Sequence, residues 1–357
     1  GRITDAAAAE SVLAEGTGEL VAMGRALVAD ASLPRKLADG QAEDVRPCTF
    51  CNGCWGEIHA GKPIACIHNP WLGRPDEAAA RLPVSNGAKT VVVVGGGVAG
   101  LEAAAVAAER GHRVVLFSAG GEPGGAARLE AALPGRAETA KVYAAQLRRL
   151  TAAGGNIRSG TLASAADVAA LGPDQVILAT GARQRMPKLG EHRHGMDLRS
   201  AVAELAREKA VTGQDGSAVL FDQDHTAATY AAADLLAARF ARLVLVTPRV
   251  QLARAVPYVS AIGVYRRLYN AGVDIELAQV PVSAPAGQVV LRNAFTGAET
   301  TIDDVALFCW ATPRLANDAL AAELEAMGLA VTRVGDAQAP RGMLAAIHEA
   351  HAAACAV

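Results

Sequence analysis

The stretch "KTVVVVGGGVAGLEAAAVAAERGHRVVLFS" (residues 89–118) places a glycine-rich turn between an apolar run and an alanine-rich segment, and ends in a second apolar run. This order predicts a strand over 90–94, a helix after the glycines and a second strand. Gly95, Gly97 and Gly100 have the G-x-G-x-x-G spacing that lets a backbone approach a diphosphate at a helix N-terminus. The stretch therefore predicts a parallel, doubly wound α/β fold with a dinucleotide site at this turn.

Three shorter pieces downstream complete the outline of a flavin-type adenine dinucleotide site: "GEPGG" (121–125), "ATGA" (179–182) and "VGDA" (334–337). The acidic residue that usually binds the adenosine ribose is replaced by Ser118, whose hydroxyl can still form a hydrogen bond, and Glu122 follows it. The identity of the nucleotide, FAD or ADP, stays open at this point. The predicted nucleotide-binding residues are Gly95, Gly97, Val98, Ala99, Gly100, Ser118, Gly125, Thr180, Gly181 and Asp336.

A second strand–turn–helix–strand unit begins at "SAVLFDQDHTAATYAAADLLAARFARLVLVTP" (217–248). Asp222, Asp224 and Ala227 stand where the glycines of a nucleotide turn are expected. Two carboxylates at that place repel a diphosphate, so the sequence predicts that NAD(P)H does not bind there. A glycine-poor turn that still binds the cofactor is the alternative.

Four of the six cysteines lie in "CTFCNGCWGEIHAGKPIACIHNP" (48–70). Two residues separate Cys48 from Cys51, and two separate Cys51 from Cys54. Eleven residues separate Cys54 from Cys66. A disulfide framework suits small secreted domains, which this chain is not. Three thiolates from one loop and a fourth from a nearby turn favour a 4Fe–4S cluster, with structural zinc as the alternative. Trp55 and Trp71 are expected to shield the cluster from water, with ordinary packing as the alternative. His59 and His68 could be ligands, but four cysteines already suffice, so they are interpreted as surface histidines or neighbours of the ligands.

The segment before the cysteines predicts two helices and a strand. Thr4 or Asp5 can cap a helix that ends at Gly16 and Gly18, and "ELVAM" (19–23) is expected to be a strand. A second helix is expected over 31–40. Further strands are expected at 174–182, 305–314 and 331–340, and a last helix over 343–354.

The overall composition sets limits on partners and location. The 357 residues include 34 basic and 36 acidic side chains, a formal net charge of −2, which gives no indication of a nucleic-acid or anionic membrane partner. No apolar run is as long as a membrane span, and no signal-peptide pattern is present, so a cytoplasmic location is expected. Residue 1 is Gly rather than Met, which suggests processing, trimming or a missing upstream part.

Taken together, these residues resemble the trimethylamine dehydrogenase family, which also contains histamine dehydrogenase and 2,4-dienoyl-CoA reductase. The resemblance extends over essentially the whole chain. It is carried, in order, by "GELVAMGRALVADASLPRKL", the cysteine segment with "CIHNP", "VVVVGGGVAGLEAA", "GGAARLEAALPG", "ATGAR" and "VGDAQAPR". Family members begin with an FMN-binding (β/α)8 barrel, of which only the last part is expected here.

The resemblance implies four parts. Residues 1–46 would be the C-terminal end of the FMN-type barrel, and 47–86 the 4Fe–4S segment and linker. Residues 87–200 with 301–357 would form the FAD- or ADP-binding domain, and 201–300 a degenerate NAD-binding-like domain nested in it.

The resemblance also implies an FMN contact at the start of the chain. Gly24 and Arg25 match the turn that binds the FMN phosphate, with FMN shared between this chain and the missing barrel.

The function implied by the resemblance is that of an electron relay. The chain would be part of an amine dehydrogenase or demethylase that passes electrons from FMN through the cluster to an electron-transferring flavoprotein. An NAD(P)H-dependent enoate or dienoyl-CoA reductase, and a non-catalytic scaffold for a separate barrel chain, are the alternatives. The expected partners are a chain or segment with the rest of the barrel and that flavoprotein, in an oligomer. No catalytic residue is assigned, because such residues would lie in the barrel.

Overall fold

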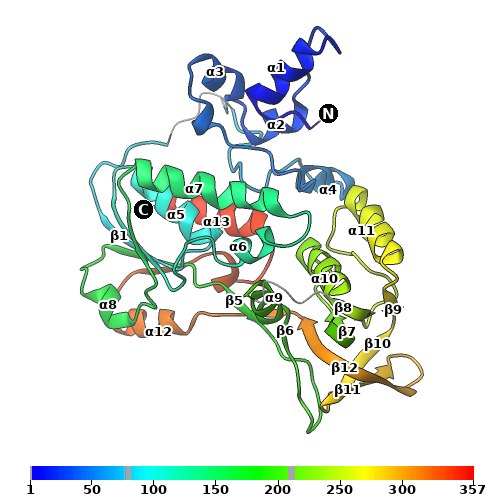
Figure 1. Cartoon of the computed structure of the whole chain (residues 1–357). Helices are drawn as coiled ribbons and strands as arrows, with labels where there is room; N and C mark the ends of the chain where they lie inside the picture. The colour runs from blue at the N-terminus through cyan, green and yellow to red at the C-terminus, as the bar shows by residue number, and fades with distance from the viewer. Residues whose placement is uncertain (1, 76, 78–81, 208–213) are drawn as a thin grey trace. The chain divides into compact units, whose positions relative to one another are not determined.

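The computed structural model describes residues 2–75, 77, 82–207 and 214–357. The chain forms two compact units. Unit 1 contains residues 1–128, 138–182 and 316–357, and unit 2 contains residues 129–137 and 183–315. Figure 1 shows the helices and strands along the chain.

Unit 1 begins with short helices. They are α1 (Ala6–Ala14), α2 (Gly24–Ala29), α3 (Leu33–Ala38), the 3-10 turn η1 (Ala42–Asp44) and α4 (Gly53–His59). The predicted cap is confirmed, because the Asp5 carboxylate accepts a hydrogen bond from the N–H of Ala8 at 2.9 Å. The helix predicted over 31–40 is confirmed as α3.

The strand predicted over residues 19–23 is wrong, because these residues have no regular structure and lead directly into α2. A strand requires a hydrogen-bonded neighbour, and 19–23 pairs with none of the strands that the structure describes. Leu20 is 92% exposed, whereas Met23 packs against the small cluster of Ala26, Leu33 and Val45. The barrel end predicted for 1–46 therefore stays a prediction.

A five-stranded sheet forms the centre of unit 1, in the order β14-β4-β1-β2-β3 with every neighbouring pair parallel. All five residues of β1 are buried, as a strand covered on both faces requires. The strands are β1 (Thr90–Val94), β2 (Arg113–Ser118), β3 (Asn156–Ser159), β4 (Gln175–Leu178) and β14 (Val331–Arg333).

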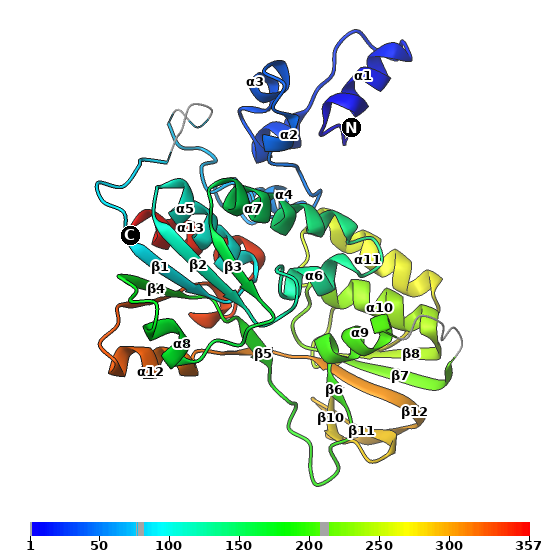
Figure 2. The same ribbon diagram turned by 60° about the vertical axis from the view of Figure 1, so that its left-hand side comes forward.

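Helices cover both faces of this sheet, as Figure 2 shows. On one face α5 (Val98–Glu109) packs against α7 (Ala140–Ala152) and α13 (Met343–Cys355). On the other face, α8 (Ala165–Ala169) and α12 (Ala319–Ala326) pack on the even-numbered valines of β1. The doubly wound α/β fold predicted from the glycine-rich stretch is thus confirmed.

Unit 2 contains a mixed sheet in the order β10-β11-β12-β7-β8-β9, with β6 paired to β12. Its parallel centre is the predicted second strand–helix–strand unit. The strands are β6 (Met196–Asp197), β7 (Gln214–Asp222), β8 (Phe240–Val246), β9 (Asp274–Glu276), β10 (Gln279–Ser283), β11 (Gly287–Asn293) and β12 (Glu299–Ala311). The helices are α9 (Leu198–Arg207), α10 (Ala227–Arg239) and α11 (Tyr258–Asn270).

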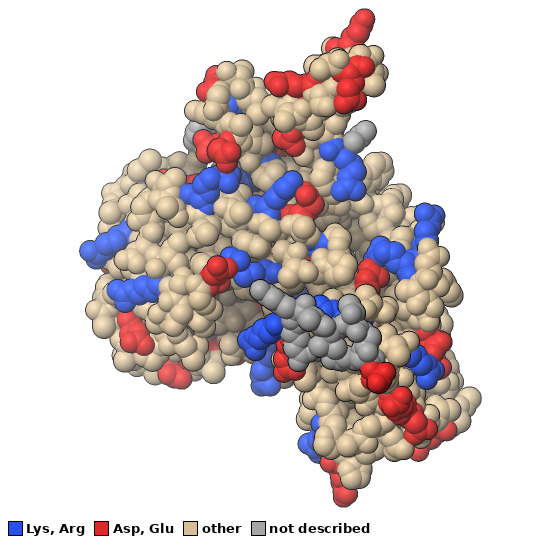
Figure 3. Space-filling view, viewed as in Figure 1, with Lys and Arg blue, Asp and Glu red and all other residues tan. Residues whose placement is uncertain are grey.

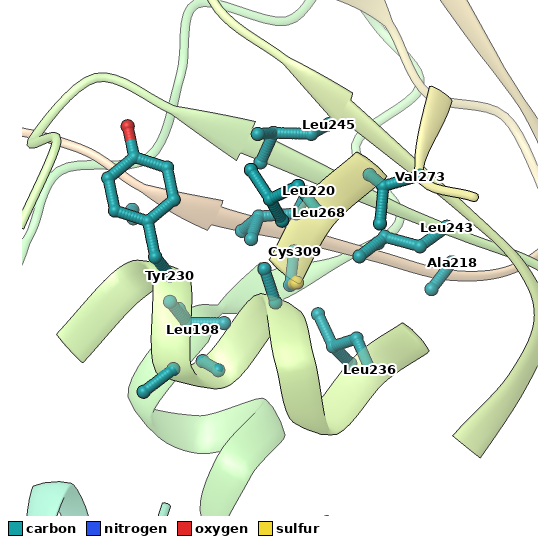
Figure 4. Close-up of a cluster of buried hydrophobic side chains, with 14 of the residues drawn as sticks. Leu198, Ala218, Leu220, Tyr230, Leu236, Leu243, Leu245, Leu268, Val273 and Cys309 are labelled. Atoms are coloured by element: carbon teal, nitrogen blue, oxygen red, sulfur yellow. The ribbon is translucent and has the colours of Figure 1, made fainter. Parts of the chain in front are cut away.

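The core of unit 2 lies between this sheet and its helices (Figure 4). Leu220, Leu236 and Leu245 are fully buried there, and Tyr230 turns its hydroxyl away from the leucines. Cys309 is also fully buried in this core.

Short elements complete the chain. They are α6 (Ala126–Ala131), η3 (Ala137–Thr139), β5 (Ala182–Gln184), β13 (Arg314–Ala316) and η4 (Gly335–Ala337). In the part of the chain that the structure describes, no helix has the length and apolar character needed to cross a membrane. On the face drawn in Figure 3, basic and acidic side chains are interspersed.

Candidate functional site

The predicted nucleotide residues lie at one edge of the sheet of unit 1. The glycine-rich turn follows β1, Ser118 ends β2, Thr180 and Gly181 follow β4, and Asp336 follows β14. Because these strands are parallel neighbours, their carboxyl ends meet at the same edge. β2 lies on one side of β1 and β4 lies on the other, so the strand order changes direction at β1. Open α/β sheets bind ligands at the carboxyl ends of the strands at such a point.

The glycines of the turn are required by close backbone approach. Gly95 has a φ of +116°, and a Cβ there would lie 2.3 Å from the carbonyl oxygen of Ala179. A Cβ on Gly100 would lie 1.8 Å from the carbonyl oxygen of Gly95. No other residue fits at either position, so α5 can begin directly against the end of β1. The N–H groups at the start of α5 thereby face the sheet edge, where they suit a diphosphate.

A second loop closes over this turn. The N–H of Gly124 donates to the carbonyl of Gly96 at 2.7 Å, and Gly97 and Gly124 form a parallel bridge. A Cβ on Gly125, which has a φ of +55°, would lie 2.9 Å from the Cα of Gly97. The predicted segment "GEPGG" therefore lies against the glycine-rich turn, backbone on backbone.

Other side chains predicted to contact the nucleotide form hydrogen bonds or ion pairs within the protein. The Ser118 hydroxyl is buried and donates to the carbonyl of Gly120 at 3.3 Å, which leaves its oxygen free only to accept. Glu122 forms an ion pair with Arg128 at 2.6 Å, and the Thr180 hydroxyl donates to the carbonyl of Asn317. A ribose contact from Ser118 stays a prediction.

The loop of the three closely spaced cysteines is compacted by two left-handed residues, Phe50 (φ +54°) and Asn52 (φ +57°). Its backbone N–H groups point at sulfur: Phe50 donates to Cys48 Sγ at 3.5 Å and Gly53 to Cys51 Sγ at 3.4 Å. The fourth cysteine, Cys66, is 9% exposed. One small cavity is lined by all four sequence-predicted ligands, Cys48, Cys51, Cys54 and Cys66.

The electrostatics of this cavity favour a bound cation. Burial raises the pKa of the Cys66 thiol to about 11, and the neighbouring Cys51 raises it further. Burial also raises the pKa of Cys48 and Cys54, with the same neighbour adding to the effect. Thiols with a raised pKa, as at Cys48, Cys54 and Cys66, become thiolates when metal charge neutralises them.

The ligand set stays a prediction, both for a cluster and for zinc. Zinc needs four ligand atoms about 2.0–2.3 Å from one centre. Among the described residues, no three His, Cys, Asp or Glu side chains converge in that way. In a 4Fe–4S cluster each thiolate binds its own iron, so the sulfurs stand around a cavity, as they do here.

Arg25 borders the same cavity. Its Nη1 donates to Asn52 Oδ1 at 2.7 Å, and its guanidinium lies 5.3 Å from the centre of the Phe50 ring. Gly24 and Arg25 open α2 instead of following a strand, so their contact with FMN phosphate stays a prediction. Trp55 is 46% exposed and stacks on His59, whereas Trp71 packs against His351.

In unit 2, the place of a second diphosphate is filled by a polar network. The fully buried Asp222 carboxylate accepts from Tyr230 Oη at 2.6 Å and from the N–H of His225 at 2.8 Å. Burial raises the pKa of Asp222 to about 7. Asp224 accepts from the N–H of Thr226 at 3.0 Å, before α10 begins. The helix start that would receive a diphosphate is thus bonded to the chain's own carboxylate.

A buried charge network that the sequence analysis missed joins α5, α7 and α13. Glu102, 2% exposed, accepts from Arg149 Nη1 at 2.9 Å and Gln146 Nε2 at 3.1 Å, and lies 3.3 Å from His351 Nδ1. Burial is the largest single effect and opposes the charge of Glu102, but Arg149, His351 and Arg46 together outweigh it and hold the pKa of the carboxyl well below its usual range. The signal in the sequence was a lone acidic residue within "GLEAAAVAA", where the helix is otherwise apolar.

Gln146 connects this network to the nucleotide turn. Its Nε2 also donates to the carbonyl of Val98, the first residue of α5, at 3.1 Å. The network is therefore hydrogen-bonded to the backbone at the start of α5.

Comparison with known proteins agrees with this arrangement. Residues 89–343 match the family described as pyridine nucleotide-disulphide oxidoreductase. The chain is 33% identical over 391 residues to the N,N-dimethylglycine/sarcosine dehydrogenase of Chromohalobacter salexigens, a match covering 98% of this chain and 56% of that protein. It is 40% identical over 185 residues to the NADH oxidase of Thermoanaerobacter brockii, covering 51% of this chain and 28% of that protein.

The solved structure of histamine dehydrogenase from Rhizobium sp. 4-9 is similar over 99% of this chain, with a TM-score of 0.89 and 25% identity. The match covers 54% of the histamine dehydrogenase chain. This chain thus spans about half the length of the relatives it matches over its whole extent. The predicted resemblance to the trimethylamine and histamine dehydrogenase group is confirmed.

Proposed function

Because the chain belongs to the pyridine nucleotide-disulphide oxidoreductase family, we propose that it is the electron-relay part of a flavin- and iron–sulfur-dependent amine dehydrogenase or demethylase. Its similarity to an N-methylated amino acid dehydrogenase and to histamine dehydrogenase supports an amine as the substrate class. The observation that carries the proposal is the cavity lined by four cysteines, in the same unit as an intact nucleotide turn.

Two parts of the chain would hold cofactors. Cys48, Cys51, Cys54 and Cys66 would ligate a 4Fe–4S cluster, which supplies one-electron transfer when bound. The N–H groups that open α5 would bind the diphosphate of FAD or ADP, while Gly95 and Gly100 keep the backbone close enough. FMN would be bound together with the rest of the barrel, supplied by another chain or segment.

The electron acceptor is proposed to be an electron-transferring flavoprotein rather than NAD(P)+. The argument is electrostatic: Asp222 and Asp224 take the hydrogen-bond positions at the start of α10 that a dinucleotide would need. A diphosphate there would face two carboxyl groups, and the N–H groups of His225, Thr226 and Thr229 are already bonded within the chain. An NAD(P)H-dependent reductase is the second candidate, because the similarity to an NADH oxidase favours it.

The test is an anaerobic visible spectrum of the full-length protein with all its cofactors. Iron and acid-labile sulfide are measured first, and about four of each per chain are expected for a 4Fe–4S cluster. Sarcosine, N,N-dimethylglycine and histamine are then each added, and in parallel NADH and NADPH. Bleaching of the flavin by an amine supports the proposal. Bleaching by NAD(P)H alone would overturn it in favour of the reductase.

A further inference from the structure

We propose that His348 on α13 positions Cys66, the fourth ligand of the proposed cluster. The inference rests on the proposed function, since it concerns a ligand of that cluster. It assigns a task to the C-terminal helix of the nucleotide-binding domain, which lies 282 residues away from Cys66 in sequence.

The first observation is a direct hydrogen bond. Nε2 of His348 lies 2.8 Å from the carbonyl oxygen of Cys66. A carbonyl oxygen only accepts, so the imidazole carries its proton on Nε2 and donates it. The bond fixes the position of the Cys66 backbone. It therefore limits the positions that the sulfur atom of this residue can take.

The second observation is that Cys66 belongs to a different turn from the other cysteines, although its neighbour Ile67 lies against their loop, at Gly53. Cys48, Cys51 and Cys54 lie within seven residues that lead into α4, and their loop is ordered by its own N–H···S bonds. Cys66 lies in a separate tight turn, bridged to Asn69. α13 adds a contact to this turn from a distant part of the chain, through His348.

The third observation is that α13 contacts the cysteine segment at two points, through His348 and His351. His351 lies one helical turn after His348 and faces the same side. Its ring packs edge-to-face on Trp71, with ring centres 5.4 Å apart and planes at 85°. Nδ1 of His351 lies 3.3 Å from the buried carboxylate of Glu102, which holds the ring in place. Two contacts spaced by one turn fix a segment in orientation as well as in position.

The same stretch of α13 also contacts the turn after β14. The N–H of Gly335 donates to Glu349 Oε2 at 3.2 Å, and a Cβ on Gly335 would lie 3.0 Å from that of Ala99 and 3.2 Å from that of Ala346. The turn after β14, the start of α5 and α13 are therefore in tight contact. One stretch of α13 thus contacts both the turn after β14, through Ala346 and Glu349, and the turn of Cys66, through His348.

The experiment compares three variants of the full-length protein. His348→Phe removes the donor but keeps a ring, and His348→Gln keeps a donor. His112→Phe is the matched control: His112 is a buried histidine of the same unit, before β2, which accepts a hydrogen bond from the N–H of Lys89. Far-UV circular dichroism establishes folding. The readouts are iron and sulfide content, the EPR spectrum of the dithionite-reduced protein and its midpoint potential.

His348→Phe is expected to lose at least half of its iron, or to change the reduction equilibrium of the retained cluster at least tenfold, which is 59 mV for one electron. His348→Gln is expected to stay near the unaltered protein, as is His112→Phe. If His348→Phe is folded with unchanged iron, spectrum and potential, the inference is wrong. It is also wrong if His112→Phe causes the same changes, because the effect would then be general destabilisation. Unaltered protein without iron and sulfide would instead overturn the proposed function itself.

Discussion

Replacement of the buried Glu102 by Gln tests the charge network behind the nucleotide turn. The change preserves the shape of the side chain and removes its charge. Glu102 has three hydrogen-bonding neighbours, and Arg149 is bonded to it at 2.9 Å. The Gln amide has only one acceptor oxygen, so one of these partners would face an NH₂ group.

The expected loss follows from burial. Removing one partner of a buried ion pair costs about 3–5 kcal/mol. Arg149 keeps a second partner, because its Nε and Nη2 both donate to Glu109 at 2.8 Å. We therefore expect the lower end of that range, about 3 kcal/mol, for the free energy of unfolding of unit 1.

The assay is urea unfolding at pH 7, with Glu109→Gln as the control. Glu109 is 28% exposed at its side chain, so its loss is expected to cost less than about 1 kcal/mol. The reasoning would be refuted if Glu102→Gln destabilised unit 1 no more than Glu109→Gln does.

The effect of pH gives a second check on the same variant. The folded pKa of Glu102 lies below its unfolded value of about 4.3, so its stabilising contribution is present above that pH and is lost as the pH falls through the folded pKa. The difference in stability between Glu102→Gln and the unaltered protein should therefore shrink in acid below about pH 4. A difference that grows in acid would show that the carboxyl is not held ionised.

Three further predictions concern the other sites. Gly100→Ala should lower the amount of adenine nucleotide retained on purification at least tenfold, because its Cβ would lie 1.8 Å from a backbone oxygen; nucleotide released on denaturation measures this, and full retention would contradict it. Asp222 has a folded pKa of about 7, above its unfolded value of about 3.9, so unit 2 should lose stability as pH rises from about 4 to 7. Asp222→Asn should remove this slope in urea unfolding, and an unchanged slope would assign it to another group. Cys54→Ser should lower bound iron below half, whereas Cys309→Ser in the core should leave it unchanged; iron analysis decides, and equal iron in both variants would contradict the ligand assignment.

The nucleotide half of the fold could be predicted because its signals are local. An apolar run, three glycines at fixed spacing and an alanine-rich helix each restrict the backbone within a few residues. The predicted β1 over 90–94 and the steric need for Gly95 and Gly100 follow from this stretch alone.

Residues 19–23 show where local pattern fails. "ELVAM" has the composition of a strand, yet a strand exists only with a hydrogen-bonded neighbour, and none of the described strands pairs with it. The same limit applies to Asp222: the sequence places it at a nucleotide turn, but not its bond to Tyr230, eight residues later and one helix turn inside α10.

The sequence by itself determined the chemistry of the ligands and the order of the elements: four cysteines at cluster spacing, a glycine turn between a strand and a helix, and carboxylates where a second diphosphate would sit. Only the tertiary structure decided which distant groups meet. Glu102 meets Arg149 and His351, and His348 meets Cys66, across 47 to 282 residues of chain. Such contacts depend on how whole helices pack on the sheet, and no short stretch of sequence encodes that packing.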